Sequence, residues 1–113
     1  MHEITVAGEL VRQIVGIMRR EHVREIVSVS VSVGALSGVE RGPLEFCFPV
    51  AAEGTVVNGA RLRVHEVPVT WSCACCGGEW TPAEFDGRCA RCGSSDVEIV
   101  RGRELTIDSL EVR

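Results

Sequence analysis

The segment EIVSVSVSVG, residues 25–34, is the clearest structural signal in this chain of 113 residues. Apolar and polar residues alternate along it, with Val27, Val29, Val31 and Val33 separated by Ser28, Ser30 and Ser32. Successive side chains of a strand point to opposite faces, so this period of two predicts a strand with one buried face. Another layer of structure must cover the valines, because a half-apolar strand is not stable alone in water.

A helix is predicted on the N-terminal side of this strand, over residues 3–21. Its apolar residues recur at steps of three and four and form one helical face: Ile4, Ala7, Leu10, Val11, Ile14, Ile17 and Met18. Arg19 and Arg20 lie near the end of the segment, where positive charge suits the helix dipole. The segment therefore reads as an amphipathic helix that covers the sheet.

The stretch of residues 43–54 predicts a second helix, with Pro43 near its start and Gly54 just past its end. Its apolar face consists of Leu44, Cys47, Phe48 and Ala51. Pro49 lacks an N–H group and clashes with the preceding turn, so we expect a kink or a shortened helix there. Cys47 is expected to be a small buried apolar residue.

Two further strands follow the second helix. Asn58-Gly59 indicates a turn, and residues 60–69 then alternate, with Leu62 and Val64 on one side. Residues 104–112 alternate in the same way. The order helix, strand, helix, strand, cysteine-rich insert and strand predicts a two-layer α+β fold with helices packed on a small sheet.

Composition restricts the possible functions of this chain. It is 45% hydrophobic and 25% charged, which is typical of a globular protein. Sixteen acidic and twelve basic residues give a net charge of −4, which disfavours general binding to nucleic acid. Neither a membrane-spanning segment nor a signal peptide is recognisable, so we expect a cytoplasmic protein. In that compartment the six cysteines favour metal binding over disulfides.

The insert CACCGGEWTPAEFDGRCARCG, residues 73–93, carries the strongest chemical signal. Cys73 and Cys76 form one C-x₂-C pair, Cys89 and Cys92 form a second, and a glycine follows each pair. Two such turns make a tetrahedral site of four thiolates that suits Zn(II). With all four positions filled by protein, the zinc would be structural. Zinc binding would also order a segment that has no apolar core of its own.

Other interpretations of the insert remain open at this point. Two disulfides, a rubredoxin-like iron site or a thioredoxin-like redox pair would also use these cysteines. Cys75 lies inside the first pair and is a possible substitute for Cys73 or Cys76, although the glycine after Cys76 favours the first assignment. Trp71, Trp80 and Phe85 would either face a protein partner or pack around the cysteine turns.

The chain begins Met-His-Glu. The α-amine of Met1, the backbone amide nitrogen of His2 and its imidazole lie along one short chain and would close two chelate rings on one ion. Glu3 would add its backbone amide or its carboxylate. Nitrogen ligands in a plane suit Ni(II) or Cu(II). A histidine at this position is commonly only a solvent-exposed residue, and His22 and His65 are also expected to be exposed or satisfied by neighbours.

Taken together, these features resemble the HypA/HybF family of nickel-insertion accessory proteins for [NiFe]-hydrogenase. The resemblance runs over essentially the whole chain and rests on the following segments: MHE at the start, VGALSGVE at 33–40, AAEGTVVNGARL at 51–62, both C-x₂-C-G pairs, and GRELTIDSLEV near the end. It departs from the family at Thr5, where serine is frequent, and at Pro49 and Cys75.

The resemblance implies a nickel-binding domain, residues 1–68 and 101–113, in which two helices pack on a three-stranded sheet. A zinc-binding domain, residues 69–100, would be inserted between the second and third strands of that sheet. It implies Ni(II) at Met1, His2 and Glu3, and Zn(II) at Cys73, Cys76, Cys89 and Cys92. It further implies a non-enzymatic metallochaperone that works with a HypB-type nickel GTPase and delivers nickel to the hydrogenase large subunit, or in some members to urease.

Two rival functions are retained. A zinc-ribbon adaptor would bind a protein or nucleic-acid partner without handling nickel, and His2 would then be incidental. A redox or rubredoxin-like iron protein would yield a coloured preparation. The sequence contains no nucleophile–base pair and no phosphate-binding glycine loop, so we predict no enzymatic activity. We expect a monomer or a homodimer that binds neither nucleic acid nor membrane.

Overall fold

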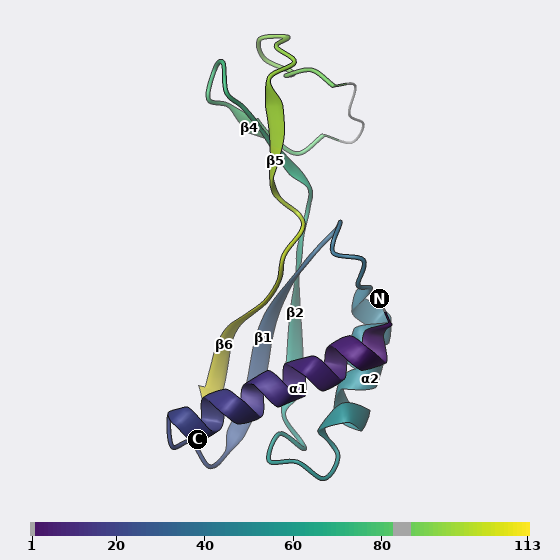
Figure 1. Ribbon diagram of the computed structural model, residues 1–113, viewed down its shortest axis with the longest axis vertical. Coiled ribbons are helices and arrows are strands. Elements are labelled where there is room, and N and C mark those ends of the chain that lie inside the picture. The colour runs from purple at the N-terminus through teal and green to yellow at the C-terminus, as the bar shows by residue number, and fades with distance from the viewer. Residues whose placement is uncertain (1, 83–86) are drawn as a thin grey trace.

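The computed structural model describes residues 2–82 and 87–113. The molecule is elongated, with extents of 53 × 26 × 16 Å, and it contains two separate sheets arranged along its long axis (Figure 1). One sheet carries both helices, and the other carries the four cysteines of the two C-x₂-C pairs. The predicted α+β class, with two helices on a three-stranded sheet and a four-cysteine insert, is confirmed.

The larger sheet has the strand order β2-β1-β6. Its central strand β1, Ile26–Gly34, is parallel to β2, Arg61–Val67, and antiparallel to β6, Leu105–Val112. All three strands were predicted within one to two residues of these bounds. The parallel pairing of β1 and β2 follows from the helix between them, which returns the chain to the end of the sheet where β1 began.

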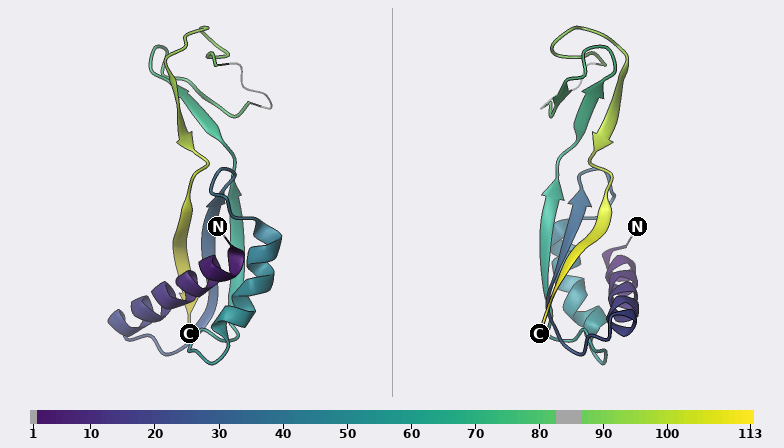
Figure 2. Two further views of the ribbon diagram at one scale, coloured as in Figure 1. Left: turned by 45° about the vertical axis from the view of Figure 1, so that its right-hand side comes forward. Right: turned by 90° about the vertical axis from the view of Figure 1, so that its left-hand side faces the viewer.

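Both helices cover the same face of this sheet (Figure 2). Helix α1, Glu3–Arg20, and helix α2, Arg41–Ala52, pack on each other and on the valines of β1. The largest fully buried side chains of this core are Phe48, Ile14, Met18, Leu44, Val29, Val31 and Val57. Each such side chain contributes about 1.5–3 kcal/mol when it leaves water, so this core is the main source of stability.

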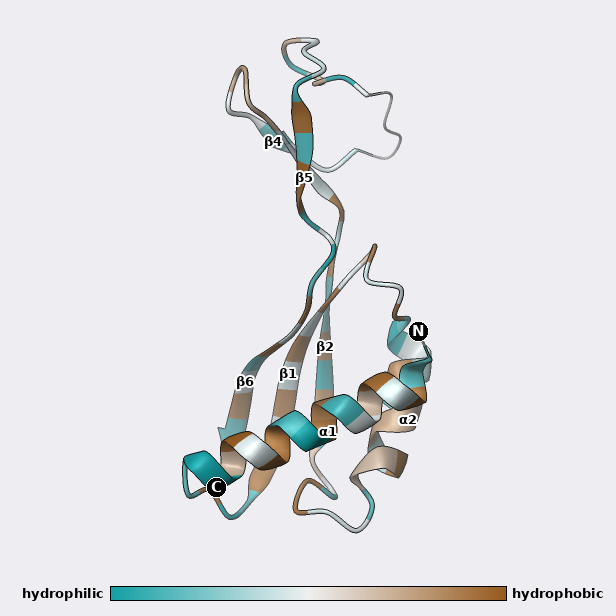
Figure 3. Cartoon of the chain, in the orientation of Figure 1, coloured by the Kyte–Doolittle hydropathy of each residue, from teal (hydrophilic) through white to brown (hydrophobic). Residues whose placement is uncertain are grey.

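The face of β1 that carries its serines is not covered by a helix, and the alternation along the strand is visible in the hydropathy colours (Figure 3). Val29, Val31 and Val33 are buried as predicted. Ser28 is also buried, at 4% exposure, which the sequence pattern did not indicate. Val27, which was predicted on the buried face, is only half-buried, so the expectation is wrong there. The pairing of β1 with β6 shifts register between Ile26 and Ser28, which interrupts the regular alternation at this point.

Helix α1 ends in a left-handed residue that is not glycine. His22 has φ 55°, and the N–H of Val23 bonds to the carbonyl of Met18 at 2.9 Å. This six-to-one hydrogen bond closes the last turn in the manner of a Schellman motif, in which glycine is the usual residue. His22 is exposed, so the predicted surface position of this histidine is confirmed.

Helix α2 is not shortened by its proline. It continues from Arg41 through Pro49 to Ala52, so of the two expected effects the shortened helix is wrong and the kink stays a prediction. Leu44, Phe48 and Ala52 form its buried side, whereas Pro49 is exposed. Glu45, whose carbonyl loses its helical hydrogen bond to Pro49, is also exposed, so solvent can reach this part of the helix.

The smaller sheet has the order β4-β3-β5 and was not predicted as strands. Its members are β3, Thr70–Cys73, β4, Glu79–Trp80, and β5, Val97–Arg101. Strands of two to five residues leave too few positions for a periodic pattern to be recognised. Trp71 lies opposite Trp80 on one side and Ile99 on the other, so one row of large side chains crosses this sheet.

The two sheets are joined by the segments between β2 and β3 and between β5 and β6. The loop that follows β1 makes backbone hydrogen bonds near the start of the first segment and within the second. The N–H of Ala35 donates to the carbonyl of Val67, the last residue of β2, at 2.9 Å, and the N–H of Leu36 donates to that of Gly102 at 2.6 Å. This loop therefore holds the end of β2 and the segment before β6 together.

Candidate metal centre

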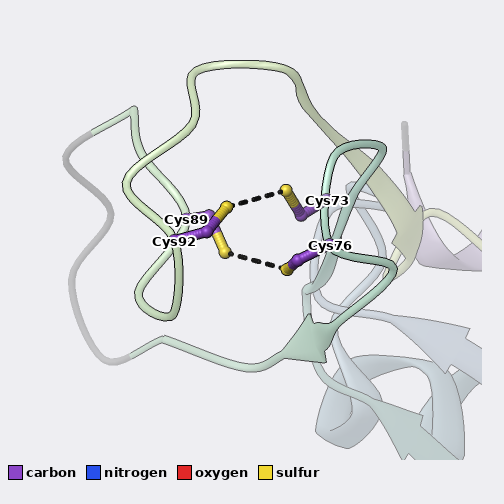
Figure 4. A group of neighbouring side chains, drawn as sticks. All are labelled: Cys73, Cys76, Cys89 and Cys92. Carbon is purple, nitrogen blue, oxygen red and sulfur yellow. Dashed lines mark hydrogen bonds between the residues drawn. The ribbon is translucent and has the colours of Figure 1, made fainter.

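The structure brings together the four cysteines of the two C-x₂-C pairs. The sulfur atoms of Cys73, Cys76, Cys89 and Cys92 all lie within 4.8 Å of one another. One pair comes from the turn after β3 and the other from the loop that precedes β5 (Figure 4). Cys73 and Cys89 are buried, and Cys76 and Cys92 are exposed, so one side of the cluster faces solvent.

The first turn is held by two backbone hydrogen bonds around Cys73. The N–H of Gly77 donates to its carbonyl at 2.9 Å, and its own N–H donates to the carbonyl of Gly78 at 2.9 Å. Gly77 has φ 74°, a conformation that a residue with a Cβ atom adopts only under strain. The predicted role of this glycine in the tight backbone of the turn is confirmed.

The second turn repeats the first around Cys89. The N–H of Gly93 donates to the carbonyl of Cys89 at 2.9 Å, the N–H of Cys89 donates to that of Ser94 at 2.8 Å, and Gly93 has φ 76°. In addition, the N–H of Arg91 points at the sulfur of Cys89 at 3.3 Å. The two turns thus present their sulfur atoms to each other from opposite sides of the cluster.

The spacing of the sulfur atoms fits a tetrahedral metal ion. A zinc ion with Zn–S bonds of about 2.3 Å requires S···S edges of about 3.8 Å. The Cys73–Cys92 and Cys76–Cys89 sulfur atoms are 3.5 Å and 3.7 Å apart. These distances are much longer than the S–S bond of about 2.05 Å in a disulfide. The geometry thus favours a metal site over a pair of disulfides.

Backbone amides in the turns favour thiolates. The N–H of Cys76 lowers the pKa of the Cys73 thiol below its usual value. The N–H of Cys92 is the main cause that lowers the pKa of the Cys89 thiol to about 6, against the opposing effect of burial. These two buried sulfur atoms are therefore prepared for the deprotonated state that metal binding requires.

Cys92 shows the opposite shift. The N–H of Ser94 lowers the pKa of its thiol, but the sulfur atom of Cys73, burial and the other two sulfur atoms together outweigh this effect and raise it to about 12. Several negative charges this close repel one another, so the cluster retains protons when no cation is present. A divalent cation is what would allow all four sulfur atoms to be thiolates at neutral pH.

The remaining cysteines lie outside this cluster. Cys75 is exposed and is not a member of the four-sulfur group, although it sits between two of its cysteines in sequence. Cys47 is half-buried and packs against the main core, as expected of a small apolar residue. Within the described residues 2–82 and 87–113, no other group of three or more metal-ligating side chains is present.

The start of α1 presents the candidate nickel ligands to solvent. His2 is the N-cap residue, with an extended backbone (φ −81°, ψ 134°), and its side chain makes no capping hydrogen bond. Its carbonyl accepts hydrogen bonds from Thr5 and Val6 at 3.1 Å each. His2 is exposed, Glu3 is half-buried in the first turn, and Met1 lies outside the described residues.

The large side chains of the insert are partly covered. Trp71 and Trp80 are half-buried and lie opposite each other in β3 and β4, whereas Phe85 lies outside the described residues. His65 is exposed on β2, as expected. In the part of the chain that the structure describes, no helix combines the length and apolar character needed to cross a bilayer.

The α+β body and the four-cysteine module define a small metal-binding protein, and comparisons with known proteins identify its family. The family model described as hydrogenase/urease nickel incorporation, metallochaperone, HypA matches residues 1–112. Hydrogenase maturation factor HypA of Chlorobaculum tepidum is 38% identical over 112 residues, which cover 99% of each chain. The factor of the same name from Chloroflexus aggregans is 40% identical over 114 residues, or 98% of each chain.

Two solved structures share the whole fold. A solution structure of HypA protein superposes with a TM-score of 0.77 at 27% identity, covering 100% of this chain and 97% of that one. The solution structure of the Ni metallochaperone HypA from Helicobacter pylori gives a TM-score of 0.71 at 27% identity, covering 99% of this chain and 97% of that one. The similarity is therefore not confined to the cysteine turns.

The chain belongs to the HypA family of nickel metallochaperones for hydrogenase maturation. This membership confirms the predicted family, the metallochaperone function and the prediction that the protein is not an enzyme. It also implies partners in the maturation machinery that incorporates nickel into hydrogenase or urease.

Proposed function

We propose that the protein binds one Ni(II) ion through Met1, His2 and Glu3 and releases it to the maturation machinery of [NiFe]-hydrogenase. The observation that carries this proposal is the free state of His2, whose exposed imidazole makes no capping hydrogen bond at the start of α1. Recruiting this ligand breaks no capping hydrogen bond, so the remaining cost is the conformational entropy of the side chain.

The backbone at this position supports the same site. The first N–H groups of a helix have no partner within the helix. A metal can therefore displace the amide protons of His2 and Glu3 without breaking any hydrogen bond of the helix. The positive end of the helix dipole also favours the resulting amide anions. With the α-amine of Met1 and the imidazole of His2, they would form the nitrogen plane that Ni(II) prefers.

The exposure of this site suits transfer rather than storage. An ion held at an open terminus can be attacked by the ligands of an acceptor before the donor ligands leave. Protonation of the amine or of His2 weakens binding, so acid favours release. The rigid part of α1 begins only a few residues away, where Val6, Ala7 and Leu10 are buried, so the ligands are presented from a fixed platform.

The four-cysteine cluster would hold Zn(II) as a structural ion. Four thiolates complete a tetrahedral shell, which leaves no open position for a substrate. Zinc would connect the two turns and so stabilise the small β4-β3-β5 sheet, whose short strands bury little apolar surface. We place this zinc-binding domain at residues 69–100 and the nickel-binding domain at residues 1–68 and 101–113.

The acceptor we propose is the hydrogenase large subunit, with a HypB-type nickel GTPase as the cooperating partner and urease as the alternative acceptor. All would be met in the cytoplasm, by a monomer or a homodimer. A zinc-ribbon adaptor that handles no nickel is the rival function, and it would leave partner binding unchanged in His2→Ala.

Calorimetric titration of Ni(II) into the zinc-loaded protein tests the proposal. We would compare the native chain with His2→Ala, with a chain extended by two residues before Met1, and with His65→Ala as a matched loss of an exposed histidine. One equivalent should bind to the native chain and to His65→Ala, and the other two proteins should lose this binding. Equal binding by all four proteins would place nickel elsewhere and overturn the assignment.

A further inference from the structure

A pocket lined by three arginines lies where β1 and β2 begin and β6 ends. This end of the larger sheet is the one farther from the smaller sheet (Figure 1). The volume of the pocket is about 350 Å³, and its three arginines are Arg24, Arg61 and Arg113. Asn58 and Gly59 of the turn before β2 also line it. Neither the candidate nickel ligands nor the cysteines contribute to this pocket.

The strand order explains why these three arginines meet. Arg24 precedes β1, Arg61 is the first residue of β2, and Arg113 follows the last residue of β6. Parallel strands β1 and β2 start at the same end of the sheet, and the antiparallel strand β6 finishes there. Three arginines from distant parts of the chain therefore line one pocket.

These charges are only partly compensated. Glu25 also lines the pocket, and its carboxylate lies 3.8 Å from the guanidinium of Arg113. Arg24 and Arg61 form no ion pair with any residue in ranges 2–82 and 87–113. Three positive side chains against one negative side chain are a local exception in a protein of net charge −4, and such an excess favours the binding of an anion.

We propose that this pocket binds a small anion through a phosphoryl group. The planar guanidinium fork binds phosphate oxygens in a bidentate manner, and all twelve basic residues of this chain are arginine. Asn58, a residue whose side-chain amide is a hydrogen-bond donor, also lines the pocket. Its volume exceeds that of phosphate alone, so a phosphate monoester fits as well as the free ion.

The apolar side of the pocket limits the kind of ligand. Ile26, Val27 and Val56 line it, and no aromatic side chain is among its lining residues. A nucleic-acid base would find no aromatic ring to stack on, and the net charge of −4 disfavours general binding to nucleic acid. The ligand class we propose is therefore free phosphate or a small phosphorylated metabolite.

A titration with inorganic phosphate tests this proposal. The protein is zinc-loaded and nickel-free, and binding is monitored through the backbone amide signals of residues 58–61. The buffer contains only chloride as the anion, at low ionic strength. Arg61→Gln and Arg24→Gln should each weaken binding roughly tenfold, because each removes one charged fork. Arg103→Gln, which removes an exposed arginine at the opposite end of β6, is the matched control and should bind like the native chain. Glu25→Gln should bind more tightly, because it removes the competing carboxylate.

Titrations with glycerol phosphate and acetate distinguish the possible ligands. Tighter binding of glycerol phosphate than of inorganic phosphate indicates a phosphorylated metabolite, and the reverse order indicates free phosphate. Equal effects of acetate and phosphate, or equal losses in Arg61→Gln and Arg103→Gln, would show general charge screening and overturn the proposal. Unchanged signals at residues 58–61 throughout the phosphate titration would also overturn it.

Discussion

Gly34 and Gly102 are in direct backbone contact at the junction between the two sheets. A Cβ atom on Gly34 would lie 2.2 Å from the carbonyl oxygen of Gly102. The N–H of Gly34 donates to the carbonyl of Glu104 at 2.7 Å, within the same junction. Gly102 itself has φ 120° and approaches the backbone of Val69. Only residues without side chains allow three segments of backbone to meet this closely.

Gly34→Ala should therefore destabilise the protein strongly. The added methyl group must push the backbone of Gly102 away and break hydrogen bonds from the loop after β1, so we expect a loss of about 2–4 kcal/mol. Denaturant unfolding of the zinc-loaded protein measures this change. Gly8→Ala in α1 is the matched control, because no atom lies within 4 Å of its added Cβ atom. The control should gain up to about 1 kcal/mol from helix propensity, and equal stability of the two variants would contradict the role of the junction.

His22→Gly should stabilise the protein. A left-handed residue other than glycine costs about 1–2 kcal/mol, and the greater freedom of glycine in the unfolded chain offsets part of this gain. We expect an increase of up to about 1 kcal/mol in the free energy of unfolding. His22→Ala keeps the strain of the positive φ of 55° and should not be stabilised. A loss of stability in His22→Gly would show that the imidazole makes a stabilising contact.

Cys76→Ser should lose stoichiometric zinc, whereas Cys75→Ser should retain it. Cys76 belongs to the four-sulfur cluster, and Cys75 is exposed outside it. Zinc binding is worth about 10–16 kcal/mol in small zinc-binding peptides, so its loss should unfold the β4-β3-β5 sheet and leave the helical core intact. Zinc content and amide signals of both sheets measure the two effects. Retention of zinc by Cys76→Ser with its loss in Cys75→Ser would reverse the assignment of the ligand.

Glu104 should make stability depend on pH in the acidic range. The N–H of Gly102 donates to its carboxylate at 2.5 Å and is the main cause that lowers the pKa of Glu104 below its usual value. A carboxyl group whose pKa is lower in the folded state stabilises it above the unfolded value of about 4.3, and this contribution is lost as pH falls through the folded value.

The difference in unfolding free energy between the native chain and Glu104→Gln should therefore be present near neutral pH and should shrink below about pH 4. Denaturant unfolding at a series of pH values, followed by helix signal, measures it. Glu98→Gln removes a charge from an exposed position on β5 and serves as the control. If the difference in unfolding free energy from the native chain shrank equally for Glu104→Gln and Glu98→Gln, the effect would come from net charge and not from Glu104.

Local patterns explain most of what could be predicted about the fold. The alternation in β1 and the three-to-four spacing in α1 each lie within one continuous segment, and the structure confirms both elements; the alternation holds from Val29 to Val33 and fails at Val27 and Ser28. Pro49 does not shorten α2, because it lies on the exposed side of the helix, which is a property of packing. The strands β3, β4 and β5 were missed because the short strands form around the two cysteine turns and show no period of their own.

The α+β class and the two C-x₂-C pairs could be read from the sequence, because periodicity and spacing are local properties of the chain, and the family followed from the resemblance of whole segments. The exclusion of Cys75 from the cluster, the contact of Gly34 with Gly102 and the pocket lined by Arg24, Arg61 and Arg113 depend on the three-dimensional arrangement. The segments of these glycines and arginines lie far apart in the chain, and nothing local in the sequence marks them as neighbours. They meet because the strand order β2-β1-β6 brings particular strand ends together, and that order is set by packing of the whole core.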